Sequence, residues 1–122
     1  MNDIIYNWLK GFPGLQLLQR QQVDAVPGGC GLFYRGAREL EQVRDLLGGI
    51  HCRRLLRFRI HRYGEPLESE VFFTMLAAWV ETSSPSLGLD APASLQNARC
   101  VRDQGGLALW EADLEITCWE DL

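Results

Sequence analysis

The sequence lacks the short motifs that mark common catalytic and nucleotide-binding sites. Its 122 residues contain no glycine-rich phosphate loop, no GxSxG nucleophile turn and no HExxH zinc motif. Its four cysteines lie far apart in the chain, which excludes CxxC redox motifs and zinc ribbons. They are Cys30, Cys52, Cys100 and Cys118. We therefore expect reduced thiols, no cofactor and no enzymatic activity.

Long apolar runs are also missing. The N-terminus has no basic region followed by an apolar segment, and no stretch approaches the roughly 20 apolar residues that cross a bilayer. We expect a soluble protein that is made in the cytoplasm and makes no membrane contact.

Lysine is nearly absent, because Lys10 is accompanied by eleven arginines among the 12 Lys and Arg residues. The net charge of −4 argues against general nucleic-acid binding. No cation follows Arg102, whereas six carboxylates do. This segregation suits head-to-tail association of copies, and it suits an internal salt-bridge ladder equally well.

The segment Cys52–Tyr63 alternates with period two, which predicts a strand with one apolar and one wet face. Its outward positions include Arg57, Arg59 and His61. A row of arginines over residues 53–62 is also a candidate phosphate-backbone surface, but pairing with an acidic strand is the favoured interpretation.

That acidic strand is predicted at Leu107–Trp119. Its outward positions are Glu111, Asp113 and Glu115. Their spacing indicates a solvated or ion-paired surface rather than paired catalytic carboxylates. The two strands either pair directly or face one another across an assembly. The predicted oligomer interface or ion-pair ladder comprises Arg57, Arg59, Glu111, Asp113 and Glu115.

The remaining elements predict an α+β fold in a single domain, residues 1–122, with a mixed, mostly antiparallel sheet packed against one long amphipathic helix and a short N-terminal helix. The long helix is expected at Leu67–Thr82, with an apolar stripe that includes Val71, Met75 and Leu76. The other predicted segments are a helix from Asn2 or Asp3, a hairpin of strands Leu15–Val23 and Cys30–Tyr34, a loop Ser84–Ala93, a strand Ser94–Arg102 and a turn Asp103–Gly106.

The segment Ala37–Leu47 is ambiguous. Leu40, Val43 and Leu47 have helical spacing, whereas the position between a strand and the Gly48-Gly49 turn favours a hairpin partner. We favour the strand.

The histidines and cysteines do not predict a metal site. His51 and His61 lie on or beside one predicted strand, about 33 Å apart, so they cannot share a metal within one chain. Convergence of His51, Cys52 and Cys30 in space is the remaining possibility, and nothing in their spacing requires it.

The order of these features resembles a known family. The stretches VPGGCGLFYRG, LLGGIHCRRLLRFRI, FFTMLAAWVE and LALWEADLEITCWE follow one another across nearly the whole chain. In this they resemble the phage tail-terminator family, also called minor capsid or minor tail proteins, of siphophages and prophages. Family members commonly have Tyr where this chain has Trp110.

The resemblance implies a structural virion protein that forms a ring, typically hexameric, on the head-proximal end of a tail tube. The ring would stop tube polymerisation and join the tail to the head connector, with DNA only passing through its lumen. Two alternatives stay open: another head–tail joining or tail-completion protein, and a small intracellular binding module.

Overall fold

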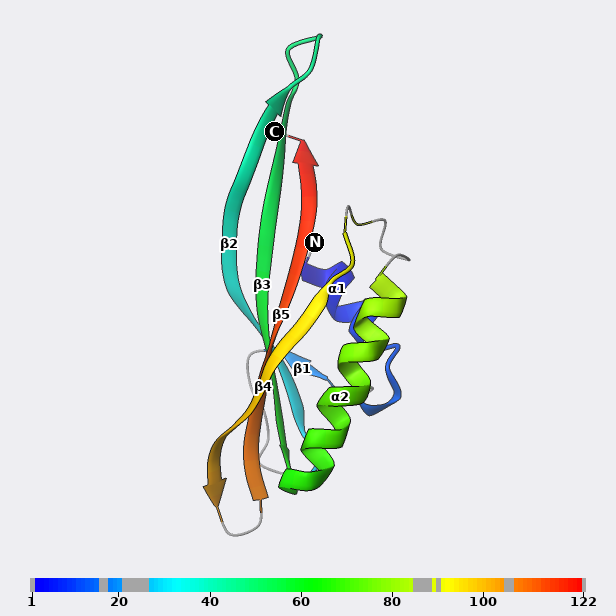
Figure 1. The fold of residues 1–122 in the computed structure, drawn as a ribbon, viewed down its shortest axis with the longest axis vertical. Helices are drawn as coiled ribbons and strands as arrows, with labels where there is room; N and C mark the ends of the chain where they lie inside the picture. Colours follow the sequence, from blue (N-terminus) through cyan, green and yellow to red (C-terminus); the bar gives the residue numbers. More distant parts are fainter. Residues whose placement is uncertain are drawn as a thin grey trace.

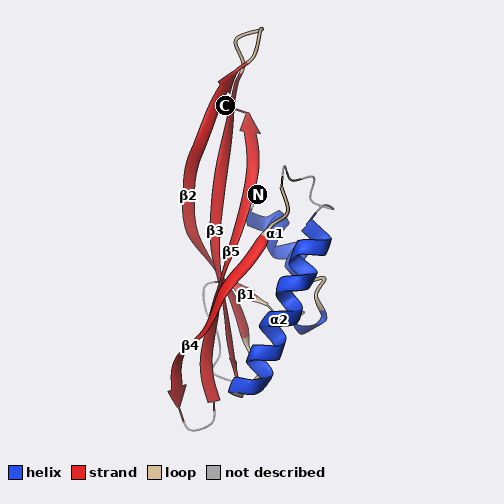
Figure 2. Ribbon diagram, in the orientation of Figure 1, coloured by secondary structure: helices blue, strands red, loops and turns tan. Residues whose placement is uncertain are grey.

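The computed structural model describes residues 2–15, 18–20, 27–84, 89, 91–104 and 107–121. The described residues form an α+β fold, as the sequence predicts (Figures 1 and 2). The elements, in chain order, are α1 (Asn2–Leu9), the 3-10 turn η1 (Pro13–Leu15), β1 (Gln19–Arg20), β2 (Cys30–Arg44), β3 (Ile50–Gly64), α2 (Pro66–Ser83), β4 (Ser94–Gln104) and β5 (Leu107–Asp121).

The strands form one mixed sheet in the order β1-β2-β3-β5-β4. Long antiparallel ladders join β2 to β3, β3 to β5 and β5 to β4, whereas the short β1 runs parallel to β2. The two strands with opposite outward charges, β3 and β5, are therefore direct neighbours in the sheet.

Both helices lie against the same face of the sheet (Figure 1). The alternation of β3 and β5 turns their apolar side chains toward this face, where they pack with the helices and bury their surface from water. A single cluster forms the core: Ile5, Leu9, Phe12, Leu15, Leu18, Cys30, Leu32, Leu56, Phe58, Ile60, Phe73, Leu76, Val80, Ala93, Ala112, Leu114, Ile116 and Cys118. No helix among the described residues covers the opposite face of the sheet.

Helix α2 begins at Pro66, where the missing amide N–H removes no helical hydrogen bond. Its buried side consists of Ser69, Phe73, Leu76 and Val80. The predicted stripe is wrong at Val71 and Met75, whose exposed fractions are 56% and 59%. Apolar residues occur on several sides of this helix, so their spacing fits more than one buried face.

The N-terminal helix is confirmed, with Ile5 and Leu9 buried. Trp8 stacks on Trp79 of α2 at 5.2 Å between ring centroids and donates from Nε1 to Ser83 Oγ at 3.1 Å. The two helices therefore contact one another as well as the sheet.

The predicted hairpin of Leu15–Val23 with Cys30–Tyr34 is wrong. Leu15 belongs to the 3-10 turn, and only Gln19–Arg20 forms a described strand, which pairs in parallel with β2. Residues 16–17 and 21–26 lie outside the described residues. The Pro27-Gly28-Gly29 signal indicates a turn but carries no information about the direction of the preceding strand.

The strand interpretation of Ala37–Leu47 is confirmed as far as Arg44. This segment continues β2, which is much longer than the predicted Cys30–Tyr34. Two β-bulges, between Tyr34 and Gly36 and between Glu39 and Glu41, interrupt the regular alternation of this strand.

The strands at the C-terminal end are confirmed and slightly longer than predicted. β4 runs to Gln104, which places the first half of the predicted Asp103–Gly106 turn in the strand, and β5 runs to Asp121. Residues 105–106 of that turn, and residues 85–88 and 90 of the predicted loop, lie outside the described residues.

Candidate functional site

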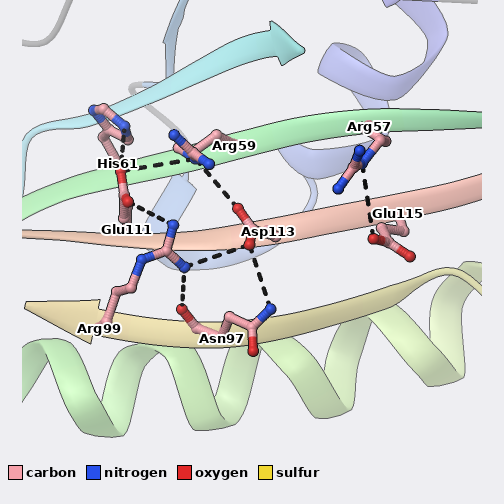
Figure 3. A network of polar contacts seen from close by, with 8 residues as sticks. All are labelled: Arg57, Arg59, His61, Asn97, Arg99, Glu111, Asp113 and Glu115. Atoms are coloured by element: carbon pink, nitrogen blue, oxygen red, sulfur yellow. Dashed lines mark hydrogen bonds and ion pairs between the residues drawn. The ribbon is translucent and has the colours of Figure 1, made fainter. Parts of the chain in front are cut away.

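The register between β3 and β5 places opposite charges directly across from one another on the face without helices. Arg57 lies opposite Glu115, and Arg59 lies opposite Asp113. The Arg57 Nε–Glu115 Oε1 distance is 3.9 Å and the Arg59 Nε–Asp113 Oδ1 distance is 3.2 Å (Figure 3). The five residues singled out from the sequence therefore lie within a single chain's ladder.

Glu111 is the most buried member of this ladder, with an exposed fraction of 9%. Its carboxylate contacts three cationic or titratable groups: Arg59 Nε at 3.7 Å, His61 Nε2 at 3.1 Å and Arg99 Nη2 at 2.6 Å. A largely buried carboxylate needs such partners, because burial without them is strongly unfavourable.

Strand β4 adds two residues that sequence reasoning did not assign to the ladder. Arg99 Nη1 lies 3.3 Å from Asp113 Oδ2, and Asn97 Nδ2 donates to the same oxygen at 3.4 Å (Figure 3). The β4–β5 pairing closes with Gln104 opposite Leu107, and a regular ladder from there would place Cys100 opposite Glu111. A bulge between Cys100 and Arg102 brings Arg99 to that position instead.

The protonation of this network follows from its surroundings. Burial raises the pKa of Asp113, but hydrogen bonds from Arg59, Arg99 and Asn97 outweigh it and leave that pKa below its ordinary value. Burial lowers the pKa of His61, and the charge of Arg59 lowers it further, against the opposing effect of Glu111. With neutral His61, the two arginines of the central network balance its two carboxylates.

A hollow of about 140 Å³ lies beside the ladder on the same face. It is lined by the charged residues Arg35, Arg57, Arg59, Asp113 and Glu115 and by Phe58 and Leu114. Most of these charged groups are engaged with one another, so the hollow presents an internally compensated surface rather than a set of free catalytic groups.

A second candidate site is the arm, which we define as the end of the sheet formed by residues 38–44 of β2, 50–55 of β3 and 117–121 of β5. It extends well past both helices (Figure 1). The β2 side chains of the arm are all exposed. At its tip, residues 45–49, Leu46 and Leu47 have exposed fractions of 105% and 98%.

The tip is nevertheless well ordered by hydrogen bonds. Asp45 Oδ1 accepts from the amides of Leu47 and Gly49 at 2.9 and 2.8 Å. Gly48 has φ of 87°, a left-handed conformation that glycine adopts without strain. The two leucines are therefore presented on a defined turn.

His51 joins this turn to the end of β5. Its Nε2 lies 2.9 Å from Asp45 Oδ2, and its Nδ1 lies 2.5 Å from Asp121 Oδ1. Hydrogen bonds to both carboxylates raise the pKa of His51, and the bond to His51 lowers the pKa of Asp45. We call Asp45, His51 and Asp121 the arm clip.

The metal-site residues considered from the sequence do not converge. Cys30 lies opposite Arg62, near the far end of β3 from His51 and Cys52. Among the described residues, no group of three or more His, Cys, Asp or Glu side chains is arranged to hold a metal ion. Within the same residues, neither helix has the length and apolar character needed to span a membrane.

Comparison with known proteins adds no family assignment: no protein-family model matches the chain, and no curated protein sequence matches it.

Proposed function

We propose that this protein is a structural, non-enzymatic component of a phage virion that caps the head-proximal end of a tail tube. In this proposal several copies, typically six, form a ring that stops tube polymerisation and joins the tail to the head connector. The proposal starts from the order of sequence features that resembles the tail-terminator family, together with the α+β fold expected for it.

The single observation that carries the proposal is the arm. Three strands continue past the helices although Cys52 and Cys118 are the only buried side chains among the arm residues, and the projection ends in two almost fully exposed leucines. Large exposed apolar groups on an ordered projection are a liability for an isolated soluble protein, and they are useful when a neighbouring subunit covers them. An assembly protein accounts for the arm better than an enzyme does.

The charge ladder supports the same proposal in a different way. Its three arginines, Arg57, Arg59 and Arg99, are each paired with a carboxylate of the same chain, so they are less available to phosphate groups. A surface of this kind would let DNA pass without tight binding, because phosphate affinity depends on available cations.

The proposal is tested by the length of tail tubes. A candidate tail-tube protein from the same phage or prophage would be expressed with and without this protein, and tube lengths would be measured by negative-stain electron microscopy. We expect shorter tubes with one capped end when both proteins are present. Unchanged lengths and bare ends, with no co-sedimentation, would contradict the proposal, whereas binding to a connector alone would favour the head–tail joining alternative.

A further inference from the structure

The tip of the arm has the character of a docking element. Leu46 and Leu47 have almost no contact with their own chain, yet the turn that presents them is fixed by Asp45. A preorganised apolar projection loses little conformational freedom on binding. Most of the free energy gained by burying its two leucines can therefore contribute to association.

An apolar surface of matching chemistry lies on helix α2. Leu67, Val71 and Met75 are spaced four residues apart, so they form one stripe along the helix. Their exposed fractions are 67%, 56% and 59%. A shallow hollow in this stripe is lined by Glu70, Val71, Thr74 and Met75.

The tip and the stripe cannot meet within one chain. Strand β3 runs from the tip at Ile50 to Gly64, just before α2, and its 15 residues span roughly 45 Å. The tip and the first turns of α2 lie at opposite ends of the molecule's long axis (Figure 1). A contact between them therefore requires a second copy.

The charges beside the two surfaces are complementary. Helix α2 carries Glu68, Glu70 and Glu81 and no basic residue. Arg44 directly precedes the tip, is exposed, and makes no ion pair with the other residues that the structure describes. An arginine beside the docking leucines and a glutamate beside the receiving stripe favour one orientation of approach.

We propose that Leu46 and Leu47 at the tip of one chain dock on the α2 stripe of a second copy, Leu67, Val71 and Met75, with the adjoining Arg44 beside Glu70. The contact joins two different surfaces, so each copy keeps a free tip and a free stripe for further neighbours. Such head-to-tail contacts generate a closed ring when the rotation between successive copies brings the last copy into contact with the first. This inference rests on the proposed function for the closure of the ring, but the contact itself requires only this chain.

Charge exchange and removal of the leucines test the contact in the intact protein. Arg44→Glu and Glu70→Arg should each weaken self-association in sedimentation equilibrium, and the two together should restore it. Leu46→Ser/Leu47→Ser should raise the apparent dissociation constant by about tenfold or more, because two large apolar side chains leave the interface. Val101→Ser, which removes another half-exposed apolar group on β4, is the matched control and should leave association unchanged.

A disulfide trap identifies the partner surface. In a Cys100→Ser background, which removes the exposed native thiol, Leu46→Cys and Val71→Cys chains are mixed under mild oxidation. We expect a cross-linked dimer from the mixture and none from a mixture of Leu46→Cys with a Val101→Cys control.

The outcomes separate this inference from the proposed function. Intact self-association in the double-serine variant, no cross-link to Val71→Cys, or a tip that cross-links only to a tube protein would overturn the docking contact while leaving tube capping possible. Association that responds to the charge exchange, combined with unaltered tail tubes, would support the contact and contradict the capping role.

Discussion

We call the part of the molecule in which the helices cover the sheet the body. The body and the arm share strands β2, β3 and β5 but are stabilised in different ways. In the body, Phe58 and Ile60 of β3 are 2% and 0% exposed because helices cover their face of the sheet. In the arm, the β2 side chains opposite the same strand are all exposed. Backbone ladders and the arm clip hold the arm together, whereas apolar burial holds the body.

This difference shows that strand formation and burial are separate properties of the sequence. Antiparallel pairing continues to Arg44 and Ile50 even where no second layer is present among the described residues. A core that ends part-way along a sheet leaves the remaining strand length available for contacts with other molecules.

The largest effect is expected in the core of the body. Phe73→Ala should lower the free energy of unfolding by about 3–5 kcal/mol, because it removes a fully buried ring and leaves a cavity. The matched arm variant Leu46→Ala should change it by less than about 0.5 kcal/mol. Urea unfolding followed by circular dichroism measures both, and a large loss for Leu46→Ala would show that the arm is part of the core.

A smaller effect is expected in the charge ladder. Glu111→Ala should cost about 2–4 kcal/mol, because Arg59 and Arg99 would lose a shared, largely buried partner. Arg57→Ala should cost less than about 0.5 kcal/mol, because its side chain is 59% exposed and its contact with Glu115 is long. Equal losses in the same unfolding assay would contradict the central role of Glu111.

The smallest effect is a difference in titration between the two histidines. The pKa of His51 in the arm lies above its ordinary value and that of His61 in the body lies below it. His51 therefore stabilises the folded arm most at pH values below its unfolded pKa, and this contribution is lost as pH rises through the raised folded pKa. His61 has the opposite sign: its contribution is present above its unfolded pKa and is lost as pH falls through the lowered folded pKa.

Histidine ring signals in an NMR titration measure this difference directly. We expect His51 to titrate at higher pH than His61, and the exchange of the Leu47 and Gly49 amides, corrected for intrinsic rates, to quicken as His51 loses its proton. His51→Gln serves as the control, since it should remove the pH dependence of the tip and leave the titration of His61 unchanged. Titration of both residues at the same pH would show that the arm clip does not form in solution.

The central strands and their charges were predictable because the signal was local and strict. The alternation in β3 and β5 specified which side chains point outward. The opposite charges at the outward positions of the two strands predicted the members of the ladder. Arg99 was not predictable, because the bulge that aligns it with Glu111 leaves no clear mark in the sequence. The exposed stripe at Val71 and Met75 was missed because α2 is apolar on several sides.

The arm was the least predictable feature. Whether a strand is covered depends on where the helices end in space, and that is a property of the whole fold rather than of residues 38–55. The parallel pairing of Gln19–Arg20 with β2 was not predictable either, since the local residue pattern does not specify the direction of a strand.

The most direct test of the proposed assembly is light scattering after size exclusion, on the protein alone and then mixed with a candidate tail-tube protein. We predict a closed oligomer, formed by the chain alone or once the tube protein is added. A monomer in both samples at high concentration would contradict this assembly, because the exposed leucines of the arm would then have no subunit to cover them.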